Sequence, residues 1–180
     1  MKRRFVFVCV AFSVLLVACG PNRNKEVRQI NALESSLMDN SVPYAVSPAT
    51  ADSMIDLYLR FADDFPADTL TPGFMLKAGD IARNFGKFDQ AERCFKCVID
   101  KYGESEAVGD AYFLLGMTYE AKADYRNARE TYRAFVREYP NHPLAHDISI
   151  QLENNMIGLS PEEMLAAVMA NNPESGDVEK

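Results

Sequence analysis

The chain lacks the residues and motifs on which most enzyme sites depend. It contains only two histidines among 180 residues, and it has no glycine-rich phosphate loop, no nucleophile elbow and no metalloprotease signature. Its carboxylates are abundant but scattered, which is typical of a solvated acidic surface. These absences argue against nucleotide-binding enzymes, serine hydrolases and metalloproteases, and we expect neither a cofactor nor a metal ion.

The two histidines do not form a convincing metal site. His142 and His146 are four residues apart beside Asp147, a spacing that suits metal ligation from one face of a helix. Pro143 stands between them where a helix is expected to start, so His142 falls outside that helix. The pattern favours capping and solvent exposure for both side chains.

Basic residues are outnumbered as well. The chain carries 19 lysines and arginines against 26 aspartates and glutamates, a net charge of −7 at pH 7. Without residues 1–18 the balance is 16 basic against 26 acidic residues, a net charge of −10. Nucleic-acid partners require a basic footprint, so we expect none. Electrostatic docking on anionic lipid is disfavoured for the same reason.

One long apolar run stands at the N-terminus. Lys2, Arg3 and Arg4 precede a run from Phe5 to Ala18 that is interrupted only by Ser13. This run is shorter than the ~20 apolar residues that span a bilayer as a helix. A basic start followed by a short apolar run predicts that residues 1–18 are a secretory signal peptide.

The end of this run, Leu16-Val17-Ala18-Cys19, resembles a bacterial lipobox. The resemblance implies cleavage before Cys19 and acylation of its thiol, with palmitate among the attached chains. Two or more acyl chains anchor a protein stably, at ~0.8 kcal/mol per buried methylene. Gly20 replaces the Asp that retains enterobacterial lipoproteins at the inner membrane, so the resemblance implies the outer membrane, facing the periplasm or the cell surface. Ordinary secretion with a free Cys19 is the alternative.

Residues 19–47 are predicted to be the acylated cysteine and a tether. The segment after Cys19 is rich in Asn, Ser and Pro and poor in large apolar side chains, so it buries too little surface to offset chain ordering. Val27, Ile30 and Leu33 nevertheless follow part of a helical stripe. A helix over about 25–38 is therefore possible, and the sequence leaves open whether that helix joins the fold.

An aromatic residue followed by proline or glycine recurs every 37 residues. The same shift aligns a series of aromatic and small residues: Phe65, Tyr102 and Tyr139; Tyr58, Phe95 and Tyr132; Phe61, Val98 and Phe135; Gly79 and Gly116. Self-similarity at this period is the mark of a repeat architecture. Each unit reads as two helices joined by a short link, so the two helices must be antiparallel neighbours. The glycines let the two backbones approach closely.

The order of Gly116, Tyr119, Tyr125, Ala128, Tyr132, Phe135 and Pro140 resembles the tetratricopeptide repeat. The resemblance covers residues 72–142, with a half unit at 49–66. The usual period is about 34 residues. The longer spacing here resembles the envelope lipoproteins of the β-barrel assembly machine and the Tol–Pal coordinator proteins. The predicted fold is all-α, with an α-solenoid of antiparallel helix pairs over 48–158 and a C-terminal capping helix and tail over 159–180.

The helix starts follow capping rules. Ser47, Thr71 and Ser160 each precede a proline, as N-cap residues do. Ser160 and Glu163 also complete a capping box. We therefore expect a helix from Pro161 to about Met169, preceded by another over 143–156, and both should cap the open end of the stack.

The repeat resemblance implies a non-enzymatic scaffold that binds a peptide or a face of another envelope protein, with a possible role in outer-membrane assembly or maintenance. First-helix residues would line the concave binding surface: Leu76, Asp80, Arg83, Asn84, Asp110, Phe113, Met117 and Glu120. Phe113 and Met117 are the expected apolar anchors, since the alignment assigns Tyr112, Leu115 and Gly116 to packing.

Cys94 and Cys97 carry the alternative function. A CxxC pair in an exported protein suggests an envelope thiol–disulfide protein. Reactive pairs of this kind use a helix N-terminus to lower the thiol pKa, whereas this pair is expected in the middle of a helix. Two thiolates are also too few for a closed zinc site. The sequence therefore favours the scaffold.

Overall fold

The computed structural model describes residues 20–38, 46–154 and 156–171. The predictions for the signal peptide, for Cys19 and for the tail from residue 172 lie outside these ranges. The described residues form eight helices: α1 (Arg23–Met38), α2 (Pro48–Asp64), α3 (Thr71–Asn84), α4 (Phe88–Lys101), α5 (Ala107–Ala121), α6 (Tyr125–Glu138), α7 (Ala145–Glu153) and α8 (Pro161–Asn171). None of these helices is both long and apolar enough to cross a membrane.

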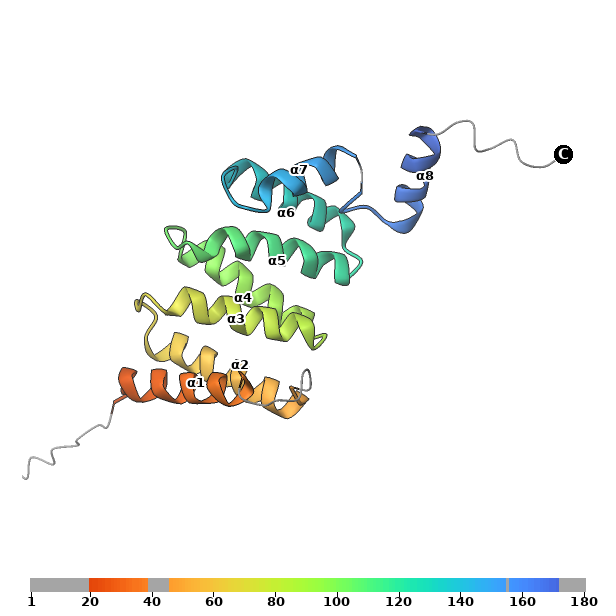
Figure 1. The fold of residues 1–180 in the computed structure, drawn as a ribbon. Coiled ribbons are helices and arrows are strands. Elements are labelled where there is room, and N and C mark those ends of the chain that lie inside the picture. The colour runs from red at the N-terminus through yellow and green to blue at the C-terminus, as the bar shows by residue number, and fades with distance from the viewer. Residues whose placement is uncertain (1–19, 39–45, 155, 172–180) are drawn as a thin grey trace, which may run out of the picture.

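The helices from α1 to α7 stack in chain order (Figure 1). Each packs against the next one along the chain, and α3 also packs against α5, so that successive first helices touch. Short links join the helices of a pair, with three residues between α3 and α4 and three between α5 and α6. The all-α solenoid of antiparallel pairs is therefore confirmed.

Glycine opposite an aromatic ring sets the distance between the two helices of a repeat. A Cβ atom on Gly79 would lie 2.6 Å from Cε1 of Phe95, and one on Gly116 would lie 2.7 Å from Cδ1 of Tyr132. Both rings are fully buried. The close helix approach expected from the sequence is thus present in both complete units, and the ring of the second helix fills the space that the glycine leaves.

The recurring aromatic residue ends the second helix of each unit. Phe65, Tyr102 and Tyr139 are the C-cap residues of α2, α4 and α6, and each donates its backbone N–H to the carbonyl four residues earlier. The following proline or glycine then turns the chain toward the next unit. The fixed interval between these residues therefore reflects the length of one helix pair and its links.

Two of the three predicted N-caps are confirmed. Ser47 accepts a hydrogen bond from Thr50 N at 3.1 Å, and the Ser160–Glu163 capping box is complete, with bonds of 2.9 and 3.2 Å. The prediction for Thr71 is wrong, because α3 already begins at Thr71 and its hydroxyl instead donates to the carbonyl of Phe65 at 2.6 Å.

The tether prediction is wrong for residues 23–38, which form α1. Ile30 is 1% exposed and belongs to the core, and Glu34 accepts hydrogen bonds from Tyr58 on α2 and Lys77 on α3. Arg23 pairs with Asp68 in the link between α2 and α3. One apolar stripe on an otherwise polar helix is enough for packing, so the helical stack already starts at Arg23.

The prediction that the last two helices cap the stack is correct for only one of them. The helix expected over 143–156 is shorter, and as α7 it packs on α6 and covers that end of the stack. The next helix begins at Pro161 as expected, but α8 packs against no other described helix and stands apart in Figure 1. Capping therefore falls to α7 and not to α8.

Candidate partner-binding surface

The structure brings the predicted binding residues together on two neighbouring helices. Four of them lie on α3 and four on α5, in the order Leu76, Asp80, Arg83, Asn84, then Asp110, Phe113, Met117, Glu120. Spacings of three and four residues place side chains on the same side of a helix. The helices α3 and α5 pack against each other, so the two sets are neighbours, and we call the eight residues together the first-helix surface.

The aspartates of this surface stay open to solvent. The side chain of Asp80 is 42% exposed and bonds to Arg83 Nη2 at 2.8 Å. The side chain of Asp110 is 51% exposed and lies 3.1 Å from Nε2 of His142. The ion pair of Asp80 with Arg83 is exposed and therefore weak, and the contact of Asp110 with His142 leaves half of the Asp110 side chain open to solvent. Both carboxylates therefore remain available to a basic group.

The carboxylate of Glu120 forms hydrogen bonds within the protein. Its carboxylate accepts a hydrogen bond from the Tyr132 hydroxyl at 2.9 Å and another from the backbone N–H of Gly158 at 2.8 Å. Burial and the neighbouring Glu120 charge raise the pKa of Tyr132 well above its usual range, so the phenol stays a donor. Glu120 thus joins α5, α6 and the segment before α8, a contact that the sequence did not predict.

Phe113 and Met117 are shared between the core and the surface. The ring centroid of Phe113 lies 6.3 Å from that of Tyr132 and 6.2 Å from that of Phe135. Both Phe113 and Met117 are half-buried and pack against the core. The expectation that these two side chains are left over after core packing is therefore only half right, because each presents part of its surface and supports the fold with the rest.

A pocket between α1, α2 and α3 extends the surface beyond the residues that the sequence indicated. It measures about 320 Å³ and is lined by Glu34, Leu37, Met54, Tyr58, Lys77, Asp80 and Ile81. Partial burial alone would raise the pKa of Glu34, but hydrogen bonds from Lys77 and Tyr58 lower it below its ordinary value. The apolar stripe of residues 27–37 was the only sequence signal for this part of the surface.

The side chain of His142 makes structural contacts on both sides of its ring. Its Nδ1 accepts a hydrogen bond from Leu144 N at 3.2 Å, and its ring meets Phe135 edge to face at a centroid distance of 5.0 Å. With Asp110 on Nε2, both ring nitrogens are engaged. It precedes α7, as predicted, while His146 is exposed on that helix. No group of three potential metal ligands occurs in the part of the chain that the structure describes.

The cysteine pair lies in the middle of α4, far from the helix N-terminus. Burial is the main cause that raises the pKa of the Cys94 thiol to about 11, and Cys97 adds to the effect. Cys94 is 3% exposed, Cys97 is half-buried, and both are free thiols. A buried thiol with a raised pKa holds very little thiolate at neutral pH, so this geometry weighs against thiol–disulfide exchange.

Comparison with known families agrees with the helix pairs. Residues 110–142, which cover most of α5, all of α6 and the following link, match the model of the tetratricopeptide repeat family. No curated protein matches the chain. Repeats of this kind generally act as non-catalytic scaffolds that bind other proteins or peptides along their stacked helices. The second unit is therefore similar to a tetratricopeptide repeat in both sequence and helix arrangement.

Proposed function

We propose that this protein is a non-catalytic scaffold that binds a segment of another protein across α1, α3 and α5. The observation that carries the proposal is the packing of the two first helices α3 and α5 side by side, in a stack whose second unit matches the tetratricopeptide repeat. The surface combines half-buried apolar side chains with exposed charges, which is the usual composition of a transient interface.

The chemistry of the surface defines the partner. Leu76, Phe113 and Met117 offer apolar contact in its centre, and Asp80 and Asp110 keep exposed carboxylates beside them. Without residues 1–18 the chain carries 16 basic against 26 acidic residues, a net charge of −10, which attracts a positively charged partner at long range. The fitting ligand is therefore a protein segment with an apolar stripe and basic flanks.

We further propose that the scaffold works in the bacterial cell envelope, held at the outer membrane by acyl chains on Cys19. The support is the Leu16–Cys19 sequence behind a basic start and the resemblance of the 37-residue repeats to those of envelope lipoproteins. A role in outer-membrane assembly or maintenance follows from that resemblance. The alternative thiol–disulfide function gains no support from the buried Cys94.

Site-specific photo-crosslinking in living cells tests the binding surface. A photoreactive residue in place of Asn84 or Asp110, both exposed on first helices, should capture a discrete protein partner. The same residue in place of Arg93 on α4 or Arg126 on α6, which are exposed on second helices, is the matched control. Equal capture from both sets of positions would show that binding is not confined to the first-helix surface.

Charge substitution tests the specificity. The change Asp80→Lys together with Asp110→Lys should reduce the yield of captured partner at Asn84, because it reverses the charges that a basic flank would meet. The substitution Asp100→Lys, at an exposed aspartate on α4, should leave the yield unchanged. An unaffected yield in the double variant would contradict a basic partner.

A further inference from the structure

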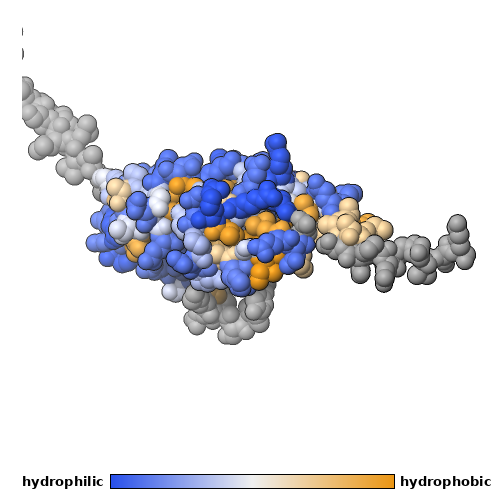
Figure 2. All heavy atoms as spheres, turned by 90° about the horizontal axis from the view of Figure 1, so that it is seen from above, coloured by the Kyte–Doolittle hydropathy of each residue, from blue (hydrophilic) through white to orange (hydrophobic). Residues whose placement is uncertain are grey.

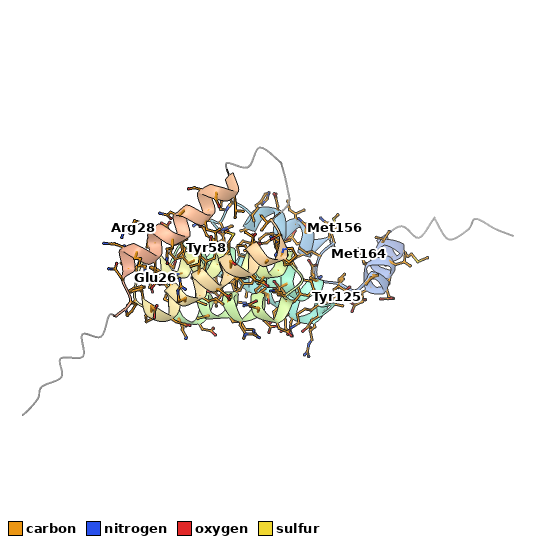
Figure 3. All side chains as sticks on the ribbon, turned by 90° about the horizontal axis from the view of Figure 1, so that it is seen from below. Glu26, Arg28, Tyr58, Tyr125, Met156 and Met164 are labelled. Atoms are coloured by element: carbon orange, nitrogen blue, oxygen red, sulfur yellow. The ribbon has the colours of Figure 1, made fainter. Side chains whose placement is uncertain are left out.

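Both glutamates of α1 turn inward, so the outer face of this helix carries no carboxylate. Glu26 is 8% exposed, and Glu34 accepts hydrogen bonds from Tyr58 and Lys77. Arg28 lies on the opposite side of the helix from Glu26, because two residues advance about 200° at 3.6 residues per turn. Figure 3 shows both side chains on α1. The exposed residues of α1 are basic, polar or small: Arg23, Asn24, Lys25, Arg28, Gln29, Asn31, Ala32, Ser35 and Ser36.

Three exposed aspartates of the neighbouring helix α2 lie on its side toward α4. Asp52 pairs with Lys87, the residue before α4, and Asp56 lines the same small pocket. Asp63 follows Asp56 by seven residues, which is about two helical turns, so it shares this side. These carboxylates therefore point away from α1.

The two carboxylates nearest to the start of α1 are engaged with that helix. Burial raises the pKa of Glu26, and the neighbouring Asp64 charge adds to the effect, so Asp64 faces the inner side of α1. Asp68 accepts two hydrogen bonds from the guanidinium of Arg23 and offsets its charge.

Three exposed cations gather on the outer side of α1. Lys25 and Arg28 belong to this helix, and Arg60 reaches it from α2, with Nη2 3.5 Å from Oε1 of Gln29. We call Lys25, Arg28 and Arg60 the basic face. It is the side on which α1 presents cations and no carboxylate of its own.

The opposite end of the stack has the reverse charge. The helix α7 contains no lysine or arginine, and it exposes Asp147 and Glu153. Figure 2 shows this end, where apolar side chains lie between polar ones. The basic face therefore distinguishes the α1 end from the α7 end.

The α1 end is also the end that the proposed anchor reaches. Only residues 20–22 separate Cys19 from α1. Four extended residues span at most ~14 Å. A membrane that holds acyl chains on Cys19 therefore lies close to the start of α1.

The net charge of −10 without residues 1–18 argues against docking on anionic lipid, but this value averages over the whole stack. Charges are screened over ~8 Å at physiological ionic strength, which is less than the ~10–12 Å diameter of one helix. A membrane beside α1 therefore interacts mainly with the basic face and little with the carboxylates of more distant helices.

We propose that the basic face lies on the anionic phospholipid headgroups of the membrane that holds Cys19, so that the stack stands on the membrane by its α1 end. The proposal deepens the envelope function proposed above and rests on its lipid anchor. Lys25, Arg28 and Arg60 pair with headgroup phosphates, as basic residues next to a membrane anchor do. Glu34 and Leu37 line the pocket on another side of α1, which stays open to a protein partner.

Fluorescence quenching by lipid headgroups tests this contact. The protein isolated from membranes, with Cys94→Ser and Cys97→Ser, carries one fluorophore on Ala32→Cys at the outer face or on His146→Cys at the α7 end. It is reconstituted in phosphatidylcholine vesicles with or without phosphatidylglycerol, and a nitroxide on the headgroups quenches only nearby fluorophores. With phosphatidylglycerol we expect strong quenching at position 32 and weak quenching at position 146.

Neutralising the basic face should remove the quenching at position 32. Each basic residue near an anionic surface strengthens binding roughly fivefold, so Lys25→Gln with Arg28→Gln should lower the docking equilibrium about 25-fold. Arg93→Gln with Arg126→Gln removes the same charge from exposed positions on second helices and is the matched control, which should keep the quenching.

Each of the opposite results overturns the proposal in a different way. If the protein floats with the vesicles but position 32 is quenched no more than position 146, or equally without phosphatidylglycerol, the docking is wrong and the lipid anchor stands. If the protein does not float with the vesicles, the anchor fails and the docking fails with it. A photoreactive residue in place of Ala32 that captures a discrete protein in cells would assign the basic face to an acidic protein instead.

Discussion

Gly116 lies directly against the ring of Tyr132, so that a Cβ atom at Gly116 would sit 2.7 Å from Cδ1 and 2.8 Å from Cζ of the ring. The ring cannot move away easily, because it is fully buried and its hydroxyl bonds to Glu120 at 2.9 Å. The contact fixes the distance between α5 and α6 and recurs as Gly79 against Phe95 in the preceding unit.

Substitution Gly116→Ala should therefore lower stability. We expect the free energy of unfolding to fall by up to about 2 kcal/mol, because overpacking costs ~1–3 kcal/mol and the improved helix propensity returns roughly 1 kcal/mol. The matched control is Gly73→Ala on α3, where a Cβ atom would meet nothing within 4 Å, and stability there should rise. Urea denaturation of both variants measures the two opposite changes in the free energy of unfolding. A gain of stability in Gly116→Ala would contradict the close contact.

Glu26 should make stability depend on pH. Burial and the nearby Asp64 charge raise its pKa, and Arg60 offsets this only in part. A carboxyl whose pKa is higher in the folded than in the unfolded state costs stability above the folded pKa and costs nothing below the unfolded one. Glu26→Gln should therefore raise the melting temperature at pH 7, and this difference should shrink as the pH falls toward 4.

The control for Glu26 is Glu92, a carboxylate whose pKa is lowered in the folded state. Partial burial would raise the pKa of Glu92, but hydrogen bonds from Lys122 and Lys96 lower it to about 2. Glu92 therefore stabilises the folded state above the unfolded pKa, and this contribution is lost as the pH falls toward 2. Glu92→Gln should lower the melting temperature at pH 7. If the melting temperature at pH 7 fell in both variants, the raised pKa of Glu26 would be contradicted.

The two thiols should differ in reactivity. In a chain with Cys9→Ser and Cys19→Ser, the half-buried Cys97 should react with a disulfide reagent at pH 7.5 while Cys94 stays unmodified until the protein unfolds, since burial raises the pKa of the Cys94 thiol to about 11. Single variants Cys94→Ser and Cys97→Ser separate the two rates. A fast reaction at Cys94 in the native protein would revive the thiol–disulfide function.

The proposed anchor depends on one atom, the Sγ of Cys19. We expect Cys19→Ser to abolish incorporation of radioactive palmitate and to release the protein from the membrane fraction, because serine offers no thiol for acylation. Cys9→Ser lies in the same apolar run and should leave labelling intact. Continued incorporation of palmitate into Cys19→Ser would contradict the lipoprotein proposal.

The sequence by itself determined the repeats, because each depends on contacts within one unit. Gly116 and Tyr132 are 16 residues apart, and the aromatic C-caps bond to a carbonyl four residues earlier, so a fixed period records both. The Ser160–Glu163 capping box is local in the same way. The helix pairs and their links could therefore be derived from spacing, whereas the predicted binding residues rested on the resemblance to the tetratricopeptide repeat and stay a prediction.

Only the tertiary structure decided what joins the stack at its two ends. Glu34 accepts a hydrogen bond from Tyr58, 24 residues further on, whereas Glu120 accepts one from Tyr132, only 12 residues further on. The connection between α1 and α2 is therefore longer than the links within the repeats, and a comparison at a 37-residue period does not detect α1. At the other end, Glu120 and Arg129 hold residues 157–158 and thereby separate α8 from α7. Both outcomes depend on contacts between segments that are distant in the sequence, and such contacts leave no periodic mark in it.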